Sequence, residues 1–312
     1  MNRLDGKVAI VFGAGPNIGG TIAYFLAREG AHVVVNDIDQ AIADETANFI
    51  TSRGHQAVGI SADAGDEKSV ESIVAETVKR YGHLDIIVNT AGKVHWSPLV
   101  EMKLSDWTEC LLSFPTAAML TTKHAAKAMI AGNRRGSVIH VLSTAAHFGE
   151  ASGTAYTASK SATLNFSRSA AMDLAHDGIR VNTITPCGME HNLWTYMHDE
   201  MFDPNFVKPK RRSYYSRDDY LKMIPLERFP RAADLAWAAV FLASDEASFL
   251  TGIDIPVDGG LRFKYPTWRP GDFTGVNIKD YMKTVQLTRY GEEHGPVTQD
   301  AGQQRSYFDG SK

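Results

Sequence analysis

The chain has 312 residues, of which 44% are hydrophobic and 22% charged, and its formal net charge is −4. This length accommodates one large α/β domain or two small ones, and the negative charge argues against general nucleic-acid binding, which requires a basic surface. The first residues contain no apolar run long enough for a signal peptide, and no run of about 20 apolar residues follows, so we expect neither a leader nor a membrane span. The two cysteines, Cys110 and Cys187, form no disulfide or metal-binding pattern, which favours a reduced, cytoplasmic setting.

Short β-rich runs alternate with longer helical patterns along most of the chain. The runs span residues 7–13, 32–37, 56–63, 84–92, 137–143, 179–186 and 253–260. The segments between them are long enough for crossover helices, which predicts a doubly wound α/β domain whose parallel sheet is covered on both faces. In such sheets ligands bind beyond the carboxyl ends of the strands. The residues that follow each run are therefore the first candidates for chemistry.

The first glycine-rich turn, VFGAGPNIGG, follows the first run and opens the first helix. Backbone amides at such a helix N-terminus can hold a pyrophosphate. Gly13 and Gly19 permit the tight turn and the close approach of helix to strand, and Asn17 is a residue that tolerates a left-handed backbone. Ordinary strand-to-helix loops also use glycine, so it is the position after the first strand that indicates a nucleotide site.

Asp37 ends the second run, about twenty residues beyond the glycines, where a carboxylate can accept hydrogen bonds from the adenosine ribose hydroxyls. Its charge would repel a 2′-phosphate, which predicts NAD(H) over NADP(H). The alternative is that Asp37 caps the next helix, a role that Asp39 can fill instead. Asp63, after the third run, can meet the adenine edge, and the small residues of NTAG (89–92) permit close approach of a cofactor.

The segment AYTASK (155–160) places Tyr156 and Lys160 four residues apart, on one face of a helix. A free phenol has a pKa of about 10, and a nearby ammonium favours the phenolate and lowers that pKa. Taken alone, the pair is more often a solvated surface pair, so the rest of the chain has to decide between the two interpretations. Ser143 ends the fifth run, where its hydroxyl can bind a substrate oxygen or cap the next segment.

The glycine turn, NTAG, Ser143, YTASK, RVNTITP and VDGG resemble, in order and spacing, the short-chain dehydrogenase/reductase family, from residue 4 to about residue 261. The resemblance implies a Rossmann-like, seven-stranded single domain, a homodimer or homotetramer, and an alcohol–ketone oxidoreductase with a nicotinamide cofactor. It implies that Tyr156 exchanges the substrate's hydroxyl proton, that Lys160 binds the nicotinamide ribose and lowers the pKa of the tyrosine, and that Ser143 orients the substrate oxygen. The cofactor-binding residues implied, with those named above, are Gly13, Asn17, Ile18, Gly19, Asp37, Asp63, Ala64, Asn89, Ala91, Gly92, Tyr156, Lys160, Pro186, Gly188 and Met189. No metal is implied.

The departures from the family pattern cluster around the nicotinamide. Asn17 stands where the family has glycine, and Thr90 replaces asparagine in NTAG. Phe114 occupies the position of an asparagine that holds a water in the proton relay from the lysine, and phenylalanine cannot hydrogen-bond. Pro115 predicts a local break in the same helix.

After the sixth run, Cys187 replaces a glycine, and His191 stands where a threonine commonly contacts the carboxamide. Adenine-end binding is therefore the firmer expectation, and the route of the proton is left open.

The insertion at 187–230 lies where the family builds its substrate lid. We expect Trp194, Tyr196, Met197 and Phe202 to line the pocket, with ordinary packing of the lid as the alternative. Further substrate candidates are His147 and Phe148, which follow Ser143 closely, and His95, which follows NTAG. The basic stretch 208–212 can attract an anion or lie in solvent. The catalytic domain is expected at 1–261, and the extension 262–312 can close over a pocket or form an oligomer contact.

Three functions are compatible with these features. The first is an NAD-dependent dehydrogenase that oxidises a secondary alcohol of a small or medium-sized molecule, cyclic ones included. The second is a nucleotide-binding regulatory or scaffold protein that has lost turnover, which Phe114 and Cys187 favour and the intact Ser143, Tyr156 and Lys160 oppose. The third is a lyase- or epimerase-like reaction on the same fold, with no net change in reduced cofactor. The sequence does not identify the substrate.

Overall fold

Seven parallel strands form one sheet in the computed structural model, which describes residues 2–189 and 217–264. In chain order they are β1 (Val8–Phe12), β2 (His32–Asp37), β3 (Ala57–Ser61), β4 (Ile86–Asn89), β5 (Ser137–Val141), β6 (Arg180–Pro186) and β7 (Asp254–Val257). Each strand lies inside the run predicted for it. The spatial order is β3-β2-β1-β4-β5-β6-β7, so the predicted Rossmann-like, doubly wound sheet is confirmed.

The direction of winding reverses at β1, which pairs with β2 on one side and with β4 on the other. In register, Val11 lies between Val35 and Val88. Such a reversal leaves a crevice at the carboxyl ends of the two central strands, which is where open α/β sheets bind ligands. The glycine turn after β1 and the NTAG segment after β4 both lie at this point.

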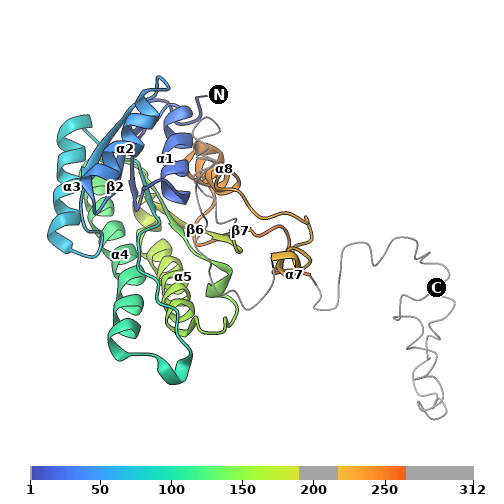
Figure 1. Ribbon diagram of the computed structural model, residues 1–312. Coiled ribbons are helices and arrows are strands. Elements are labelled where there is room, and N and C mark those ends of the chain that lie inside the picture. Colours follow the sequence, from blue (N-terminus) through green and yellow to red (C-terminus); the bar gives the residue numbers. More distant parts are fainter. Residues whose placement is uncertain (1, 190–216, 265–312) are drawn as a thin grey trace, which may run out of the picture. The chain divides into compact units, whose positions relative to one another are not determined.

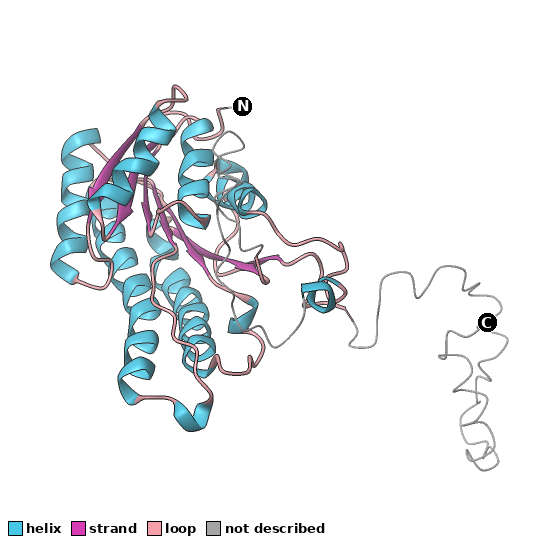
Figure 2. Cartoon of the chain, viewed as in Figure 1, coloured by secondary structure: helices cyan, strands magenta, loops and turns pink. Residues whose placement is uncertain are grey.

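Helices cover both faces of the sheet (Figures 1 and 2). They are α1 (Ile18–Arg28), α2 (Gln40–Thr51), α3 (Glu67–Tyr81), α4 (Leu104–Ala131), α5 (Thr154–Leu174), α7 (Arg217–Leu221) and α8 (Ala232–Ala243). Short 3₁₀ turns lie at η1 (Leu99–Glu101), η2 (Thr144–Ala146), η3 (Ala175–Asp177) and η4 (Asp245–Ala247). Apolar side chains of α1, α2 and α8 pack on one face, and those of α3, α4 and α5 on the other.

Alternation along β1 shows why two cores form. All five of its residues are buried; Ala9 and Val11 join the core under α1 and α8, whereas Val8, Ile10 and Phe12 join the core under α3 and α4. Full burial of each large apolar side chain stabilises the fold by about 1.5–3 kcal/mol. A strand that is buried on both faces has an unbroken run of apolar residues, which is why β1 could be predicted from the sequence.

Side-chain caps fix where the first helices begin. The Asn17 side chain accepts a hydrogen bond from the Gly19 N–H at 3.0 Å, and its φ of −150° lies outside the left-handed region. Asn17 therefore does not use the left-handed backbone that asparagine tolerates, and it caps α1 instead. Asp39 caps α2 by accepting a hydrogen bond from the Ala41 N–H at 2.8 Å. Asp37 is therefore not the N-cap residue of α2.

Helix α4 continues through Pro115 over 28 residues, so the predicted break at this proline is wrong. An interior proline costs about 3 kcal/mol or more. Buried side chains on both sides of it, among them Phe114 and Ala117, hold the helix in place, and α4 packs along α5 (Figure 1). In the described part of the chain, no helix is long and apolar enough to cross a membrane.

Candidate active site

The glycine turn is seated directly against the end of β4. A Cβ added to Gly13, whose φ is +70°, would lie 2.8 Å from Thr90 Oγ1, and a Cβ on Gly19 would lie 2.2 Å from the Gly13 carbonyl oxygen. The Thr90 hydroxyl lies 2.9 Å from the Phe12 oxygen and 2.8 Å from the Gly13 oxygen, to which it donates. Both glycines are thus required by close packing, and Thr90, which replaces the family's asparagine, ties the turn to β4.

Asp37 lies at the carboxyl end of β2 and faces the same turn. A Cβ on Gly15 would lie 3.1 Å from Asp37 Oδ2, so the missing side chain at Gly15 lets the carboxylate approach the turn. The other oxygen, Oδ1, accepts a hydrogen bond from the Asp39 N–H at 3.2 Å. Asp37 is partly buried, and Oδ2 is the oxygen in position for a ligand held by the turn.

Three further predicted cofactor residues line the same edge of the sheet. Asp63 follows β3 and is exposed, with Oδ1 accepting from the Gly65 N–H at 2.8 Å. Ala64 is buried beside it. Asn89, at the end of β4, is also buried, and its Oδ1 accepts from the Ala91 N–H at 3.0 Å, so its side chain shapes the NTAG segment.

The Ser143 hydroxyl lies beside Tyr156 and favours the tyrosine phenolate. Ser143 follows β5, and its Oγ accepts a hydrogen bond from the Ala145 N–H at 3.2 Å, which caps η2. A hydroxyl accepts and donates at once, so the cap leaves the serine hydrogen for the tyrosine oxygen. The capping role considered for Ser143 is therefore confirmed, and its contact with a substrate oxygen stays a prediction.

Burial raises the pKa of Tyr156 to about 12, and the hydrogen bond from Ser143 opposes that rise. The expected net lowering of this pKa is therefore not found in the protein without cofactor, because burial dominates. Lys160 Nζ lies over the tyrosine ring, 5.7 Å from its centroid. Withdrawal of the phenolate from water outweighs what an ammonium at that distance returns.

Lys160 itself is almost completely buried, with 4% of its surface exposed. Its Nζ donates a hydrogen bond to the Val141 carbonyl oxygen at 2.9 Å. Burial lowers the pKa of Lys160 to about 7, and Cys110 opposes the shift. The charge of this amine is therefore sensitive to its immediate neighbours.

The Phe114 ring fills the space beside these groups. Lys160 Nζ lies 3.9 Å from the centroid of the Phe114 ring, over its face. The ring also meets Tyr156 edge to face, with centroids 5.6 Å apart. The side chain at this position therefore contacts both members of the candidate acid–base pair, as its place in the family pattern implied, although its chemistry differs.

Trp96 is a site residue that the sequence analysis missed. Its ring lies 5.5 Å from that of Tyr156, centroid to centroid, and the side chain is 48% exposed. A Cβ on Gly153 would lie 2.7 Å from Trp96 Cζ3, so this glycine makes room for the indole. An aromatic residue shortly after NTAG was the available signal.

The three described substrate candidates differ in how they are held. His147 Nε2 accepts a hydrogen bond from Arg262 Nη1 and lies 3.1 Å from Asp254 Oδ2; burial and the arginine charge lower its pKa, so the neutral ring is the acceptor. Phe148 is 48% exposed and available to a ligand. His95 Nε2 lies 2.7 Å from Glu109 Oε2, which occupies that nitrogen.

The segment after β6 carries the last described cofactor candidates. Pro186 and Cys187 are buried, Gly188 is exposed, and Met189 packs on the core under α1. The Gly188 N–H donates to Tyr220 Oη at 2.7 Å, so α7 fixes this segment. Burial, together with the nearby Asp258, raises the pKa of the Cys187 thiol to about 12, which keeps it neutral.

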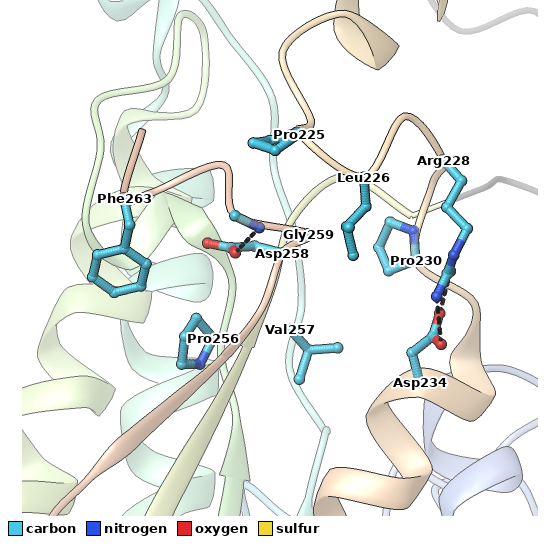
Figure 3. Close-up of a pocket in the computed structure, with 11 residues that line it drawn as sticks. Pro225, Leu226, Arg228, Pro230, Asp234, Pro256, Val257, Asp258, Gly259 and Phe263 are labelled. Carbon is cyan, nitrogen blue, oxygen red and sulfur yellow. Dashed lines mark hydrogen bonds and ion pairs between the residues drawn. The ribbon is translucent and has the colours of Figure 1, made fainter. Parts of the chain in front are cut away.

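A largely apolar cavity of about 590 Å³ opens elsewhere, between the end of β7 and the segment joining α7 to α8 (Figure 3). Its lining includes Pro225, Leu226, Pro230, Pro256, Val257 and Phe263. An ion pair between Arg228 and Asp234, 2.7 Å long, closes one side. Ser143, Tyr156 and Lys160 do not line it, so the site is defined by the contacts of these three residues and not by this cavity.

The remaining candidates, Trp194, Tyr196, Met197, Phe202, His191 and the basic stretch 208–212, lie outside the described residues. Among the described residues, no group of three or more histidine, cysteine, aspartate or glutamate side chains is arranged to hold a metal ion.

Comparison with known proteins identifies the family. Residues 13–262 match the family model described as enoyl-(acyl carrier protein) reductase. The chain is 33% identical over 260 residues to 2,5-dichloro-2,5-cyclohexadiene-1,4-diol dehydrogenase of Sphingobium indicum, covering 83% of this chain and 97% of that relative. It is 33% identical over 259 residues to sorbitol dehydrogenase of Cereibacter sphaeroides, covering 83% and 98%.

A solved structure gives the same result. The short-chain type dehydrogenase/reductase of Mycobacterium marinum superimposes with a TM-score of 0.73 and 27% identity, over 84% of this chain and 97% of that one. The motifs, the seven-stranded parallel sheet and these relatives agree. The chain belongs to the short-chain dehydrogenase/reductase family.

Proposed function

We propose that the protein is an NAD-dependent dehydrogenase that interconverts a secondary alcohol and a ketone. The observation that carries the proposal is that Ser143, Tyr156 and the buried amine of Lys160 lie together, with Lys160 Nζ 5.7 Å from the centroid of the Tyr156 ring. A protein that only bound a nucleotide would have no need of this set. Membership of the family supports an oxidoreductase with a nicotinamide cofactor.

The residues present fit such a cofactor. Three groups lie at the carboxyl ends of the neighbouring strands β1, β2 and β4. They are the glycine turn at the N-terminus of α1, the Asp37 Oδ2 oxygen, and the small residues Ala91 and Gly92. Bound NAD⁺ supplies the acceptor of a hydride from the carbinol carbon, and its positive ring favours a phenolate at Tyr156. We propose NAD over NADP because the Asp37 carboxylate would repel a 2′-phosphate.

The protein's own groups handle the proton. In the oxidation, Tyr156 Oη as phenolate takes the hydroxyl proton of the alcohol, the C–H electron pair leaves as hydride, and the C=O bond forms. Ser143 Oγ donates a hydrogen bond to the substrate oxygen and holds it beside Tyr156. Protonated Lys160 would bind the nicotinamide ribose and favour the phenolate, and reduction runs the same steps in reverse.

Trp96 supports a substrate with a flat or ring-shaped face. Its half-exposed indole lies beside the Tyr156 ring, and aromatic faces favour contact with apolar ring faces. One relative is named for a cyclic diol and another for sorbitol, an open-chain polyol. We therefore propose that small cyclic alcohols and polyols are the class to test first.

The oligomeric state and the cellular compartment of the protein are also part of the proposal. Exposed apolar side chains lie along α4, including Leu104, Leu112 and Met119, which supports the proposed homodimer or homotetramer because large exposed apolar groups mark contact surfaces. Both cysteines are free and buried, as a reduced, cytoplasmic setting would leave them. We propose 1–261 as the catalytic domain and 262–312 as an extension.

Purified protein incubated with NAD⁺ and a panel of cyclic alcohols, polyols and sugars, with NADP⁺ in parallel, tests the proposal. We expect NADH to form with at least one class and NADP⁺ to serve poorly. Tight NADH binding without turnover across the panel would replace this proposal with a regulatory nucleotide binder. Substrate conversion without net NADH would indicate a lyase- or epimerase-like reaction.

A further inference from the structure

Phe114 places the face of an aromatic ring against a buried amine. Lys160 Nζ lies 3.9 Å from the ring centroid, well within the distance of about 6 Å at which a cation is attracted by the ring quadrupole. If the contact were ordinary packing, the aliphatic stem of the lysine would cover the ring and the nitrogen would point elsewhere. Here the nitrogen itself lies over the face.

The amine has few other partners. Among the described residues, the one hydrogen bond of Nζ goes to the Val141 oxygen. An ammonium has three donors, and a buried charge is costly unless it is paired. The aromatic face therefore stabilises the charged form together with the Val141 oxygen and Cys110.

The ring is held so that it cannot turn away. Phe114 is 6% exposed and packs in a small cluster with Cys110 and Ala155. Tyr156 meets it edge to face. On its remaining side lies Gly92, where an added Cβ would come within 2.1 Å of Phe114 Cδ1, so even a methyl group there would displace the ring.

We infer that Phe114 is a positioning residue of the site, whose ring face holds the ammonium of Lys160 by a cation–π contact. This ring offers no lone pair, so it keeps the charge in place without passing a proton onward. In the catalytic cycle, which rests on the proposed dehydrogenase function, Lys160 would act as a fixed charge beside Tyr156 and not as a proton carrier on the Phe114 side.

The contact matters because Lys160 titrates near neutrality, with a pKa of about 7. A cation–π contact of about 0.5–2 kcal/mol corresponds to a pKa shift of roughly 0.5–1.5 units. Without it, Lys160 would lose its proton at a lower pH. The other titratable groups that face this amine are Tyr156 on α5, Cys110 on α4 and His140 on β5.

The test measures the Lys160 pKa directly in protein without cofactor. Lysine side chains labelled with ¹³C are titrated by NMR, and Lys160→Met assigns the signal. Phe114 is replaced by leucine and, by site-specific incorporation, by mono-, di- and trifluorinated phenylalanine, which keep the shape and weaken the ring face stepwise. Phe166→Leu, on the same helix as Lys160 and outside contact with Nζ, is the matched control.

We expect the Lys160 midpoint to fall by about 0.5–1 pH unit in Phe114→Leu, to fall stepwise with fluorination, and to stay unchanged in Phe166→Leu. An unchanged midpoint across the fluorinated series would overturn the inference, and this series remains informative if the leucine variant does not fold. The alkaline limb of the kcat/KM profile should move with the NMR midpoint. If the Lys160 midpoint shifts with fluorination in a protein that shows no turnover, the inference holds and the dehydrogenase function is refuted. If the protein turns over but the midpoint stays fixed, the dehydrogenase function holds and the inference is refuted.

Discussion

Exchange of Asp37 for asparagine should shift the cofactor preference from NAD⁺ toward NADP⁺. The carboxylate oxygen Oδ2 faces the glycine turn, and asparagine keeps its size while removing its charge. Two unit charges about 4 Å apart interact with about 4 kcal/mol at an effective dielectric constant of 20. Because Asp37 is only partly buried, we halve this to about 2 kcal/mol, or roughly 30-fold in favour of NADP⁺.

The same change weakens NAD⁺ binding. Hydrogen bonds from ribose hydroxyls to a charged acceptor contribute about 1.5–3 kcal/mol, against about 1 kcal/mol for a neutral one, so the KM for NAD⁺ should rise roughly 10-fold. Together the ratio of kcat/KM for the two cofactors should move by about 300-fold. Steady-state kinetics with both cofactors and one saturating alcohol measure it.

Asp39→Asn provides the matched control. This neighbouring carboxylate caps α2 through the Ala41 N–H, and asparagine is an equally good cap. We expect it to leave the cofactor ratio within about threefold, since exposed charges farther from the ligand are largely screened. If Asp37→Asn left the ratio unchanged, or if Asp39→Asn shifted it equally, the assignment of Asp37 to the ribose would be refuted.

Three further outcomes follow from buried contacts. Burial holds the pKa of Lys160 near 7, below its ordinary 10.5, so between these values the folded state binds fewer protons than the unfolded state. This group therefore makes the free energy of unfolding rise as pH rises from about 7 to about 10.5. Lys160→Met should remove that rise, which urea unfolding at pH 7 and pH 9.5 measures. Gly92→Ala should lower the free energy of unfolding by about 1–3 kcal/mol through its clash with Phe114, and Phe114→Ala in the same chain should recover part of that loss. Arg262→Met should cost about 3–5 kcal/mol, because Asp254 is 8% exposed and loses its 2.7 Å partner.

Each of these has a result that would contradict it. Identical pH dependence of unfolding in wild type and Lys160→Met would show that the amine titrates normally. Additive effects of the Gly92 and Phe114 changes in a double-mutant cycle would show that the two positions do not touch. A melting temperature unaffected by Arg262→Met would mean that the carboxylate of Asp254 is solvated.

The sheet was predictable because its signals are local. Each strand is an apolar run bounded by turn residues, and the glycine turn follows the first of them, so the seven strands and their ends could be placed from the sequence. Local rules failed at Pro115. The helix cap made by Asn17 was not foreseen, and packing of α4 on α5 overrode the helix-breaking tendency of Pro115.

The unpredicted part of the site consists of contacts between residues far apart in the chain. His147 and Arg262 are 115 positions apart, yet the arginine donates to the histidine, which the position of His147 after Ser143 does not indicate. The contact of the Trp96 ring with the Tyr156 ring and that of the Phe114 ring with Lys160 Nζ also join residues that are far apart in the chain. Such contacts depend on side-chain rotamers and on how helices pack against each other, and neither of these produces a local pattern in the sequence.

The account rests most directly on Tyr156 as the acid–base group. The measurement is NADH formation from NAD⁺ and the best alcohol of the panel by wild type and Tyr156→Phe, with NADH affinity determined by fluorescence on both proteins. We predict a fall in kcat of about 10²–10⁴-fold with an NADH dissociation constant that changes by no more than about threefold, since Tyr156 is one of many cofactor contacts and the only group assigned to move the proton. A variant that turns over within a few-fold of wild type would contradict the central claim.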